Sequence, residues 1–141
     1  MTRIMGVDLG TERTGVAIGS FGVAHPLKVV EASNEDEIIA RLVQIAGDEN
    51  AKEIVFGLAI SLDGTEGPAA ARQRAFAARL GDATNLPVHL WDERLTTTEA
   101  ESALIGVGVG RKERRAVIDK VAAAILLQSY LDAHRTVREE E

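Results

Sequence analysis

The spacing of apolar and polar residues predicts five strands and four helices along the chain. Short apolar runs bounded by turn residues indicate strands, whereas apolar residues that recur every three or four positions indicate helices. The predicted strands cover residues 3–9, 14–20, 27–32, 53–59 and 87–91. The predicted helices run from an N-cap at Ser33 to about residue 47, from Pro68 to about residue 80, from a capping box at 96–99 to the glycines at 106–110, and over about 113–134.

The order of these elements predicts an α/β fold. The first three strands follow one another locally, the first two joined by a turn at residues 10–13, and should pair antiparallel. The later strands alternate with helices and should join the sheet in parallel through right-handed crossovers. The expected architecture is a mixed five-stranded sheet, antiparallel in its first three strands and parallel in the later ones, with helices flanking it.

Three carboxylates interrupt otherwise apolar segments. Asp8 lies within the first predicted strand, Glu93 follows the fifth, and Asp119 interrupts the last helix. A buried carboxylate is costly unless something pairs with it, and ligands of open sheets bind at the carboxyl ends of parallel strands. Together the three acids suggest a divalent-metal site. Each has a structural alternative: Asp8 as a turn residue, Asp119 as an ion-pair partner of Arg115 or Lys120, and Asp92 as the acid that joins Asp8 in place of Glu93.

The composition predicts one domain over residues 1–141 in a soluble, cytoplasmic protein. The chain has no cysteine, no apolar run long enough for a membrane span and no apolar core of a signal peptide. Its net charge is −6, and residues 136–141 are expected to form a frayed acidic tail. A basic cluster at residues 111–115 departs from this acidic balance, and the combination is compatible with a nuclease. A homodimer is also compatible with the sequence.

The three acids suit the hydrolysis of a phosphodiester bond. Two Mg²⁺ or Mn²⁺ ions about 4 Å apart can activate a water and stabilise the leaving oxygen, and such hard cations prefer carboxylate ligands. Without metal, the like charges should raise at least one carboxylate pKa. The candidate contacts to nucleic-acid phosphates are Arg94, Arg111, Lys112, Arg114, Arg115 and Lys120, with Arg13 as a weaker one.

Four segments add a family resemblance: residues 6–17 (GVDLGTERTGVA), 57–67 (GLAISLDGTEG), 92–97 (DERLTT) and 118–123 (IDKVAA). In this order they resemble the YqgF/RuvX family, whose members are described as Holliday junction resolvases and pre-16S ribosomal RNA nucleases. The resemblance implies an RNase H-like fold and a metal site built from Asp8, Glu93 and Asp119, with Glu93 chosen over Asp92. It implies a metal-dependent endonuclease that processes the 5′ end of pre-16S rRNA, resolves Holliday junctions, or does both. The chain departs from the family pattern at Ala59 and Ser61, so no substrate contact is assigned there.

Two other functions remain as alternatives. Residues 8–11 also resemble the first phosphate loop of the actin, Hsp70 and sugar-kinase superfamily, although those proteins close their nucleotide cleft with a second related domain. The glycines at 106–110 lack both a preceding strand and the last glycine of a dinucleotide fingerprint. A catalytically silent ribosome-assembly module that binds nucleic acid on the same fold is the second alternative, and metal titration would distinguish it from a nuclease.

Overall fold

The computed structural model describes residues 2–95 and 111–134, and for residues 111–118 it describes the backbone alone. The helix predicted from residue 96, the glycines at 106–110 and the tail at 136–141 lie outside the described residues. The elements are β1 (Ile4–Asp8), β2 (Arg13–Ser20), β3 (Val23–Glu31), α1 (Glu35–Asp48), β4 (Glu53–Leu58), α2 (Pro68–Thr84), β5 (Val88–Asp92), the 3₁₀ helix η1 (Glu93–Leu95) and α4 (Arg111–Ala133).

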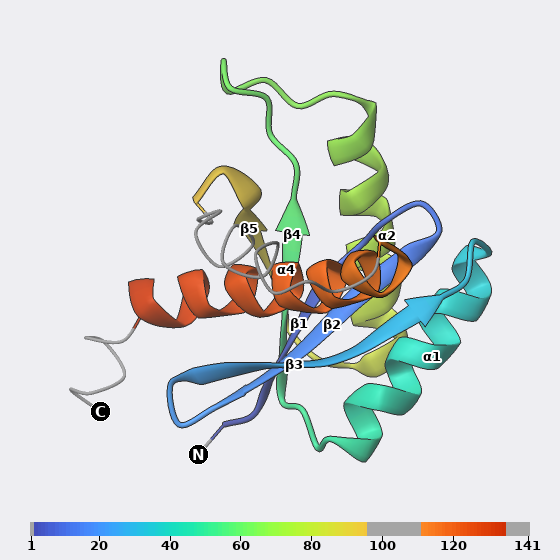
Figure 1. Ribbon diagram of the computed structural model, residues 1–141, viewed down its shortest axis with the longest axis vertical. Coiled ribbons are helices and arrows are strands. Elements are labelled where there is room, and N and C mark those ends of the chain that lie inside the picture. The colour runs from blue at the N-terminus through green and yellow to red at the C-terminus, as the bar shows by residue number, and fades with distance from the viewer. Residues whose placement is uncertain (1, 96–110, 135–141) are drawn as a thin grey trace.

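The five strands form one mixed sheet in the order β3-β2-β1-β4-β5 (Figure 1). The pairs β1–β2 and β2–β3 are antiparallel, and the pairs β1–β4 and β4–β5 are parallel. The predicted sheet is therefore confirmed, including the change from antiparallel to parallel pairing. Because β1, β4 and β5 run in the same direction, the residues that follow them meet at one edge of the sheet.

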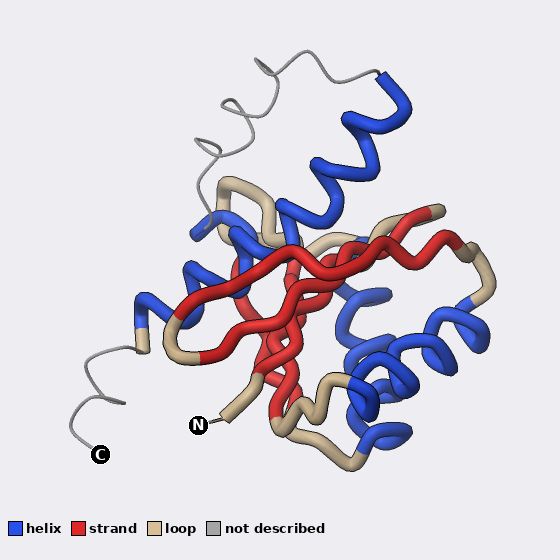
Figure 2. Tube along the Cα trace, turned by 60° about the horizontal axis from the view of Figure 1, so that its bottom comes forward, coloured by secondary structure: helices blue, strands red, loops and turns tan. Residues whose placement is uncertain are grey.

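The two faces of the sheet are covered by different helices (Figures 1 and 2). On one face, large side chains of the strands pack against α1 and α2 in a core that includes Met5, Phe56 and Phe76. On the other face, Ile4 and Val55 pack against α4. Successive strand residues point to opposite faces, so Asp8 lies on the α4 face, in line with Ile4 and Gly6.

Glycines allow α4 to lie close to the sheet. A Cβ added at Gly6 would lie 2.9 Å from Leu127 Cβ, and one added at Gly19 would lie 3.0 Å from Leu131 Cδ1. The closest approach is at Gly15, where an added Cβ would lie 2.0 Å from the backbone oxygen of Asp119. Because Gly15 has no side chain, the backbone of α4 at residue 119 can lie directly over β2.

Several element boundaries differ from the prediction. The N-cap of α1 is Asn34, whose Oδ1 accepts a hydrogen bond from the backbone N–H of Glu37, so the prediction of Ser33 was wrong by one residue. Strand β3 begins at Val23 because Phe21 and Gly22 both adopt positive φ and close a tight hairpin. Helix α2 continues to Thr84 and ends where Asn85 takes the left-handed conformation.

Within the part of the chain that the structure describes, no helix is both long and apolar enough to cross a membrane.

Candidate functional site

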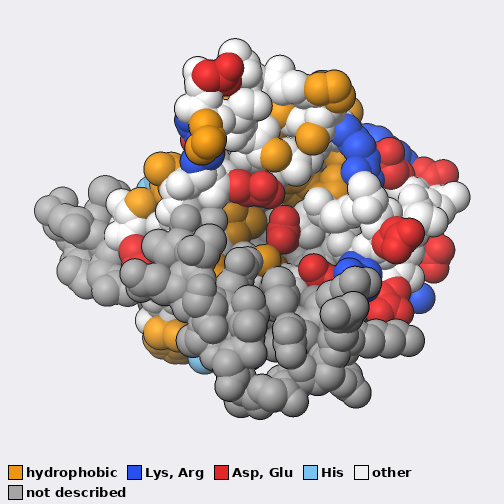
Figure 3. Space-filling view, turned by 45° about the horizontal axis from the view of Figure 1, so that its top comes forward, with side chains coloured by type: hydrophobic (Ala, Val, Ile, Leu, Met, Phe, Trp, Pro, Cys, Tyr) orange, Lys and Arg blue, Asp and Glu red, His pale blue; other side chains and the backbone are white. Residues whose placement is uncertain are grey.

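Two carboxylates meet at the carboxyl edge of the parallel strands. Asp8 is the last residue of β1, and Glu93 is the first residue of η1, directly after β5. The two side chains are hydrogen-bonded, and partial burial together with the negative charge of Asp8 raises the pKa of Glu93 to about 7. Two acids in contact bind a shared proton in place of a second negative charge. The edge therefore holds surplus negative charge that a cation would neutralise. Figure 3, with the top of Figure 1 tilted forward, shows acidic side chains near its middle.

A glycine makes room for Glu93. A Cβ added at Gly57 in β4 would lie 2.7 Å from Glu93 Oε1 and 3.1 Å from Leu126 Cδ2. Gly57 pairs with Trp91 in β5, so the turn into η1 carries Glu93 back over the end of β4. The carboxylate of Glu93 thus occupies space that any other residue at position 57 would fill.

Asp92 has a different partner from Glu93. Its carboxylate receives hydrogen bonds from the backbone N–H and the guanidinium of Arg94, with an Nη2–Oδ2 distance of 2.7 Å. These hydrogen bonds lower the pKa of Asp92. Arg94 also donates from Nη1 to the backbone oxygen of Ser61. The structure therefore places Glu93 beside Asp8, and it places Asp92 in an ion pair that ties η1 to the loop after β4.

Asp119 lies near this edge but is bonded to a cation of the chain itself. Arg13 Nε donates to Asp119 Oδ2 at 2.7 Å, and both side chains are about a third exposed. The sequence-based alternative for Asp119 named Arg115 or Lys120 as the ion-pair partner. Lys120 has no ion pair among the described residues, and the side chain of Arg115 is not described. Arg13 was predicted only as a weak phosphate contact, and its bond to Asp119 is therefore new.

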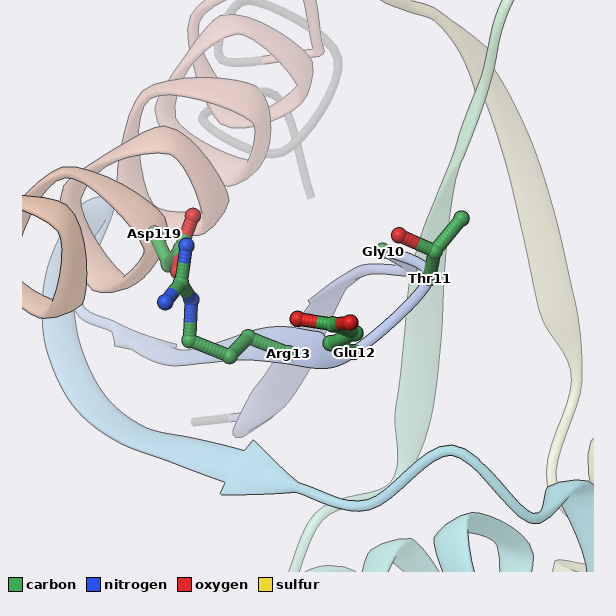
Figure 4. Close-up of a pocket in the computed structure, with 5 residues that line it drawn as sticks. All are labelled: Gly10, Thr11, Glu12, Arg13 and Asp119. Carbon is green, nitrogen blue, oxygen red and sulfur yellow. The ribbon is translucent and has the colours of Figure 1, made fainter.

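The ion pair borders an open pocket of about 200 Å³ (Figure 4). Its lining consists of the turn residues Gly10, Thr11 and Glu12 together with Arg13 and Asp119. The turn is tight, since a Cβ at Gly10 would lie 2.1 Å from the backbone oxygen of Arg13. In Figure 4 the guanidinium of Arg13 extends from β2 toward Asp119 on α4. The pocket joins the turn after β1 to the helix that carries the third acid.

The loop after β4, where the chain departs from the family pattern, is held by hydrogen bonds. The backbone N–H of Ala59 donates to Oε1 of the buried Gln73 at 2.7 Å. Ser61 donates from its backbone N–H to Thr65 O, and its own backbone oxygen accepts from Gly64. Contacts from α2 and η1 thus hold this loop in place.

The predicted basic residues fall into three groups. Arg94 is bonded to Asp92, and Arg13 is bonded to Asp119. Lys120 is partly exposed on α4, next to Asp119. The side chains of Arg111, Lys112, Arg114 and Arg115 lie outside the described residues, so their role as phosphate contacts remains a prediction.

The donors at this edge suit a hard divalent cation, because they are carboxylate oxygens with surplus negative charge. Among the described residues, no three His, Cys, Asp or Glu side chains are grouped closely enough to hold an ion. Asp8 and Glu93 form a pair, and the third predicted ligand is bonded to Arg13. The chain itself thus brings two of the three predicted ligands together, and the third, Asp119, lies over Gly15, the residue of β2 that pairs with Asp8.

Sequence reasoning missed the roles of Gly15 and Gly57 at this edge, and it missed the pairing of Arg13 with Asp119. Gly15 and Gly57 matter because they have no side chain, which leaves space for α4 and for Glu93. A glycine within a strand is an ambiguous signal in a sequence, because it also marks bulges. Arg13 is two residues before Gly15, so both point to the α4 face. That spacing was the available signal for a contact between Arg13 and α4.

A mixed five-stranded sheet in this strand order, with a helix across one face, is the RNase H-like fold. In agreement, the structure of Thermus thermophilus RuvC in complex with Holliday junction substrate matches this fold with a TM-score of 0.61, covering 94% of this chain and 96% of that chain. The sequences of the two proteins are 17% identical, so the match shows the fold alone.

Sequence comparison then gives the family. The family model described as RuvX, Holliday junction resolvase, matches residues 2–133. A Pelotomaculum thermopropionicum protein named "Putative pre-16S rRNA nuclease" is 45% identical and covers 98% of this chain and 92% of its own. A Geobacillus kaustophilus protein of the same name is 45% identical, with 94% and 99% covered. This chain belongs to the RuvX family, and the family predicted from the four motifs is confirmed.

Proposed function

We propose that this protein is a divalent-metal-dependent nuclease that hydrolyses phosphodiester bonds in structured nucleic acid, with precursor 16S rRNA as its substrate. The hydrogen-bonded pair of Asp8 and Glu93 carries the proposal. It places an acid with a pKa of about 7 at the carboxyl edge of an RNase H-like sheet. Perturbed carboxylates in such a position are typical of functional sites. The names of the 45% identical relatives favour RNA over a DNA junction as the substrate.

Asp8, Glu93 and Asp119 are the residues that would hold Mg²⁺ or Mn²⁺. Two such ions would lower the pKa of an attacking water and stabilise the charge on the leaving oxygen. Without a cation, Glu93 retains its proton up to about pH 7, and it must release that proton to become a ligand. Gly57 keeps open the space that Glu93 occupies.

Binding of the substrate would rest on the cations around these acids. Lys120 lies on α4 beside Asp119, and the basic residues at 111–115 precede it on the same helix. Contacts of this type hold the phosphate backbone and fix its position, without reading base sequence. Arg94 is less suited to this role because its guanidinium already contacts Asp92 and Ser61.

The direct test is a cleavage assay on precursor 16S rRNA and on a four-way DNA junction, each with Mn²⁺ and with EDTA. Wild type should cleave the RNA only with the ion present, and Glu93→Gln should lose activity by orders of magnitude. Asp92→Asn is the matched control, since it removes the neighbouring acid while leaving the Asp8–Glu93 pair intact, and it should retain most activity. Cleavage of the junction alone would make DNA the substrate. Absence of cleavage together with normal nucleic-acid binding would favour a silent assembly factor.

A further inference from the structure

The charges at the carboxyl edge are balanced in two different ways. Glu93 shares a proton with Asp8, whereas Asp119 is neutralised by the guanidinium of Arg13. Both partners can be exchanged: a proton leaves when a cation arrives, and an ion pair that is about a third exposed can open. A divalent cation that binds Asp119 must compete with Arg13 for the same carboxylate.

Arg13 keeps donors available while it is bonded to Asp119. Only its Nε has a hydrogen-bond partner among the described residues, so the two Nη nitrogens of the planar guanidinium are not engaged by them. The guanidinium borders the open pocket of about 200 Å³, which is larger than a phosphodiester group. Arginine binds phosphate through two parallel N–H donors, and this geometry suits the Nη edge.

Glu12 adds a negative charge to the pocket. Its exposed carboxylate lines the same space, so a phosphate would meet both an attractive and a repulsive side chain there. While Arg13 remains paired with Asp119, the two acids outnumber the single cation. A divalent cation on Asp119 would reverse this balance and free the guanidinium, so the pocket would favour an anion only once such a cation has replaced Arg13 at Asp119.

We infer that Arg13 is an exchangeable counter-ion: it neutralises Asp119 in the metal-free protein and moves to a substrate phosphate when a divalent cation takes that carboxylate. The inference rests on the proposed function and adds an order of binding: the cation binds first, since the phosphate contact at Arg13 forms only in the metal-bound protein. Arg13 is then a positioning residue that links binding of the cation to binding of the nucleic acid.

The first measurement is Mn²⁺ binding by calorimetry without nucleic acid. Arg13→Gln removes both the competing partner and a positive charge near the acids, and it should tighten Mn²⁺ binding by about tenfold. Arg13→Lys retains a cation that can pair with Asp119, and its affinity should stay within about threefold of wild type. An unchanged or weakened affinity in Arg13→Gln would overturn the inference.

The second measurement is the salt dependence of RNA binding, in EDTA and in Ca²⁺, with fluorescence anisotropy on a labelled precursor 16S rRNA fragment. Ca²⁺ is a hard cation that binds carboxylate oxygens, and gels of the same samples verify that the RNA stays intact. In EDTA, wild type and Arg13→Gln should have the same salt slope. In Ca²⁺, the slope of the variant should be smaller by about one phosphate contact. An equal loss in both conditions would show a fixed phosphate contact and would contradict the exchange.

Two controls separate this inference from the proposed function. Arg3→Gln breaks an ion pair to Glu49 with the same 2.7 Å distance and similar exposure, 36% and 30% against 32% and 29%, at the other end of the sheet. It should change neither measurement. Glu93→Gln should lose Mn²⁺ affinity whatever Arg13 does. If wild type binds no Mn²⁺, the proposed function fails; if wild type binds the ion and Arg13→Gln matches it, only the exchange fails.

Discussion

The two ends of strand β1 differ in how their charged side chains are paired. At its amino end, Arg3 donates from Nη2 to a carboxylate oxygen of Glu49 at 2.7 Å and from Nε to the backbone oxygen of the same residue at 2.6 Å. At its carboxyl end, Asp8 hydrogen-bonds a second acid, Glu93, and burial together with the negative charge of Asp8 raises the pKa of Glu93 to about 7. The first end is neutralised by the chain itself, whereas the second retains surplus negative charge. This difference supports the proposal that the carboxyl end, and not the amino end, binds a cation.

Glycines near the two ends differ in the space around them. Gly47 lies near the amino end, in the last turn of α1, and has nothing within 4 Å of where a Cβ would be. At the carboxyl end, a Cβ at Gly15 would lie 2.0 Å from Asp119 O, and one at Gly57 would lie 2.7 Å from Glu93 Oε1. Helix and carboxylate thus occupy space that these two glycines leave open.

The largest effect on stability is expected for Gly15→Ala. The added methyl group meets the backbone of α4, which cannot rotate away as a side chain can, so the helix must shift. We expect a loss of about 3 kcal/mol in the free energy of unfolding, measured by urea denaturation in EDTA. Gly47→Ala should be neutral or stabilising by up to about 1 kcal/mol, since it replaces a helical glycine in open space. Equal effects of the two variants would contradict the close approach of α4.

The next largest effect is expected in the pH dependence of stability, which depends on the raised pKa of Glu93 at the carboxyl end of β1. The pKa of Glu93 is about 7 in the folded protein against its usual value of 4.5, so folding is favoured by proton uptake between these values. The stability contributed by this proton is fully present below about pH 4.5 and is lost as the pH rises through 7. Glu93→Gln cannot titrate, so in EDTA at pH 8 it should be more stable than wild type by roughly 2 kcal/mol.

The matched variant for this titration is Asp92→Asn. Hydrogen bonds from Arg94 lower the pKa of Asp92, so its contribution is present above its usual pKa and is lost as the pH falls. Asp92→Asn should therefore be no more stable than wild type at pH 8. Unfolding curves from pH 4 to 9 in EDTA test both variants, and parallel curves for wild type and Glu93→Gln would exclude a protonated acid pair.

Gly57→Ala should affect function more than stability. The added methyl group meets the far end of the flexible Glu93 side chain, which can move at little cost, although Leu126 must also adjust. We expect a loss of about 1 kcal/mol in the free energy of unfolding, together with a fall of tenfold or more in Mn²⁺ affinity. If Gly57→Ala binds Mn²⁺ like wild type, the position of the Glu93 side chain over Gly57 is not needed for cation binding.

The smallest stability effect is expected for Asp119→Asn. It removes the ion pair with Arg13, and a pair this exposed contributes at most about 1 kcal/mol. Cleavage should nevertheless fall by orders of magnitude, because the amide cannot replace a charged ligand. From sequence alone, loss of this acid would be expected to relieve repulsion and raise stability without metal. Because Asp119 is bonded to Arg13, we expect Asp119→Asn to be slightly less stable than wild type. Melting curves in EDTA measure whether the stability falls or rises.

The sequence predicted the sheet well, because its strands are apolar runs and its crossovers follow general rules. It predicted Asp8 as an anomaly for the same reason, since a carboxylate in an apolar strand stands out. The choice of Glu93 over Asp92 needed the family resemblance, because the turn into η1 breaks the alternation that would have separated them. The pairing of Arg13 with Asp119 joins residues 106 positions apart. The spacing of Arg13 and Gly15 indicates a contact with α4, but no local pattern reveals which residue of α4 is the partner.

In the proposed function, the Asp8–Glu93 pair binds a divalent cation and releases a proton as it does so. Titration of Mn²⁺ into the metal-free protein at pH 6, with calorimetry in buffers of different ionisation enthalpy, measures affinity and proton release together. We predict binding by wild type with release of nearly one proton, and at least tenfold weaker binding by Glu93→Gln with almost none. Binding of equal strength by the two proteins, without proton release, would show that the Asp8–Glu93 pair is not the cation site.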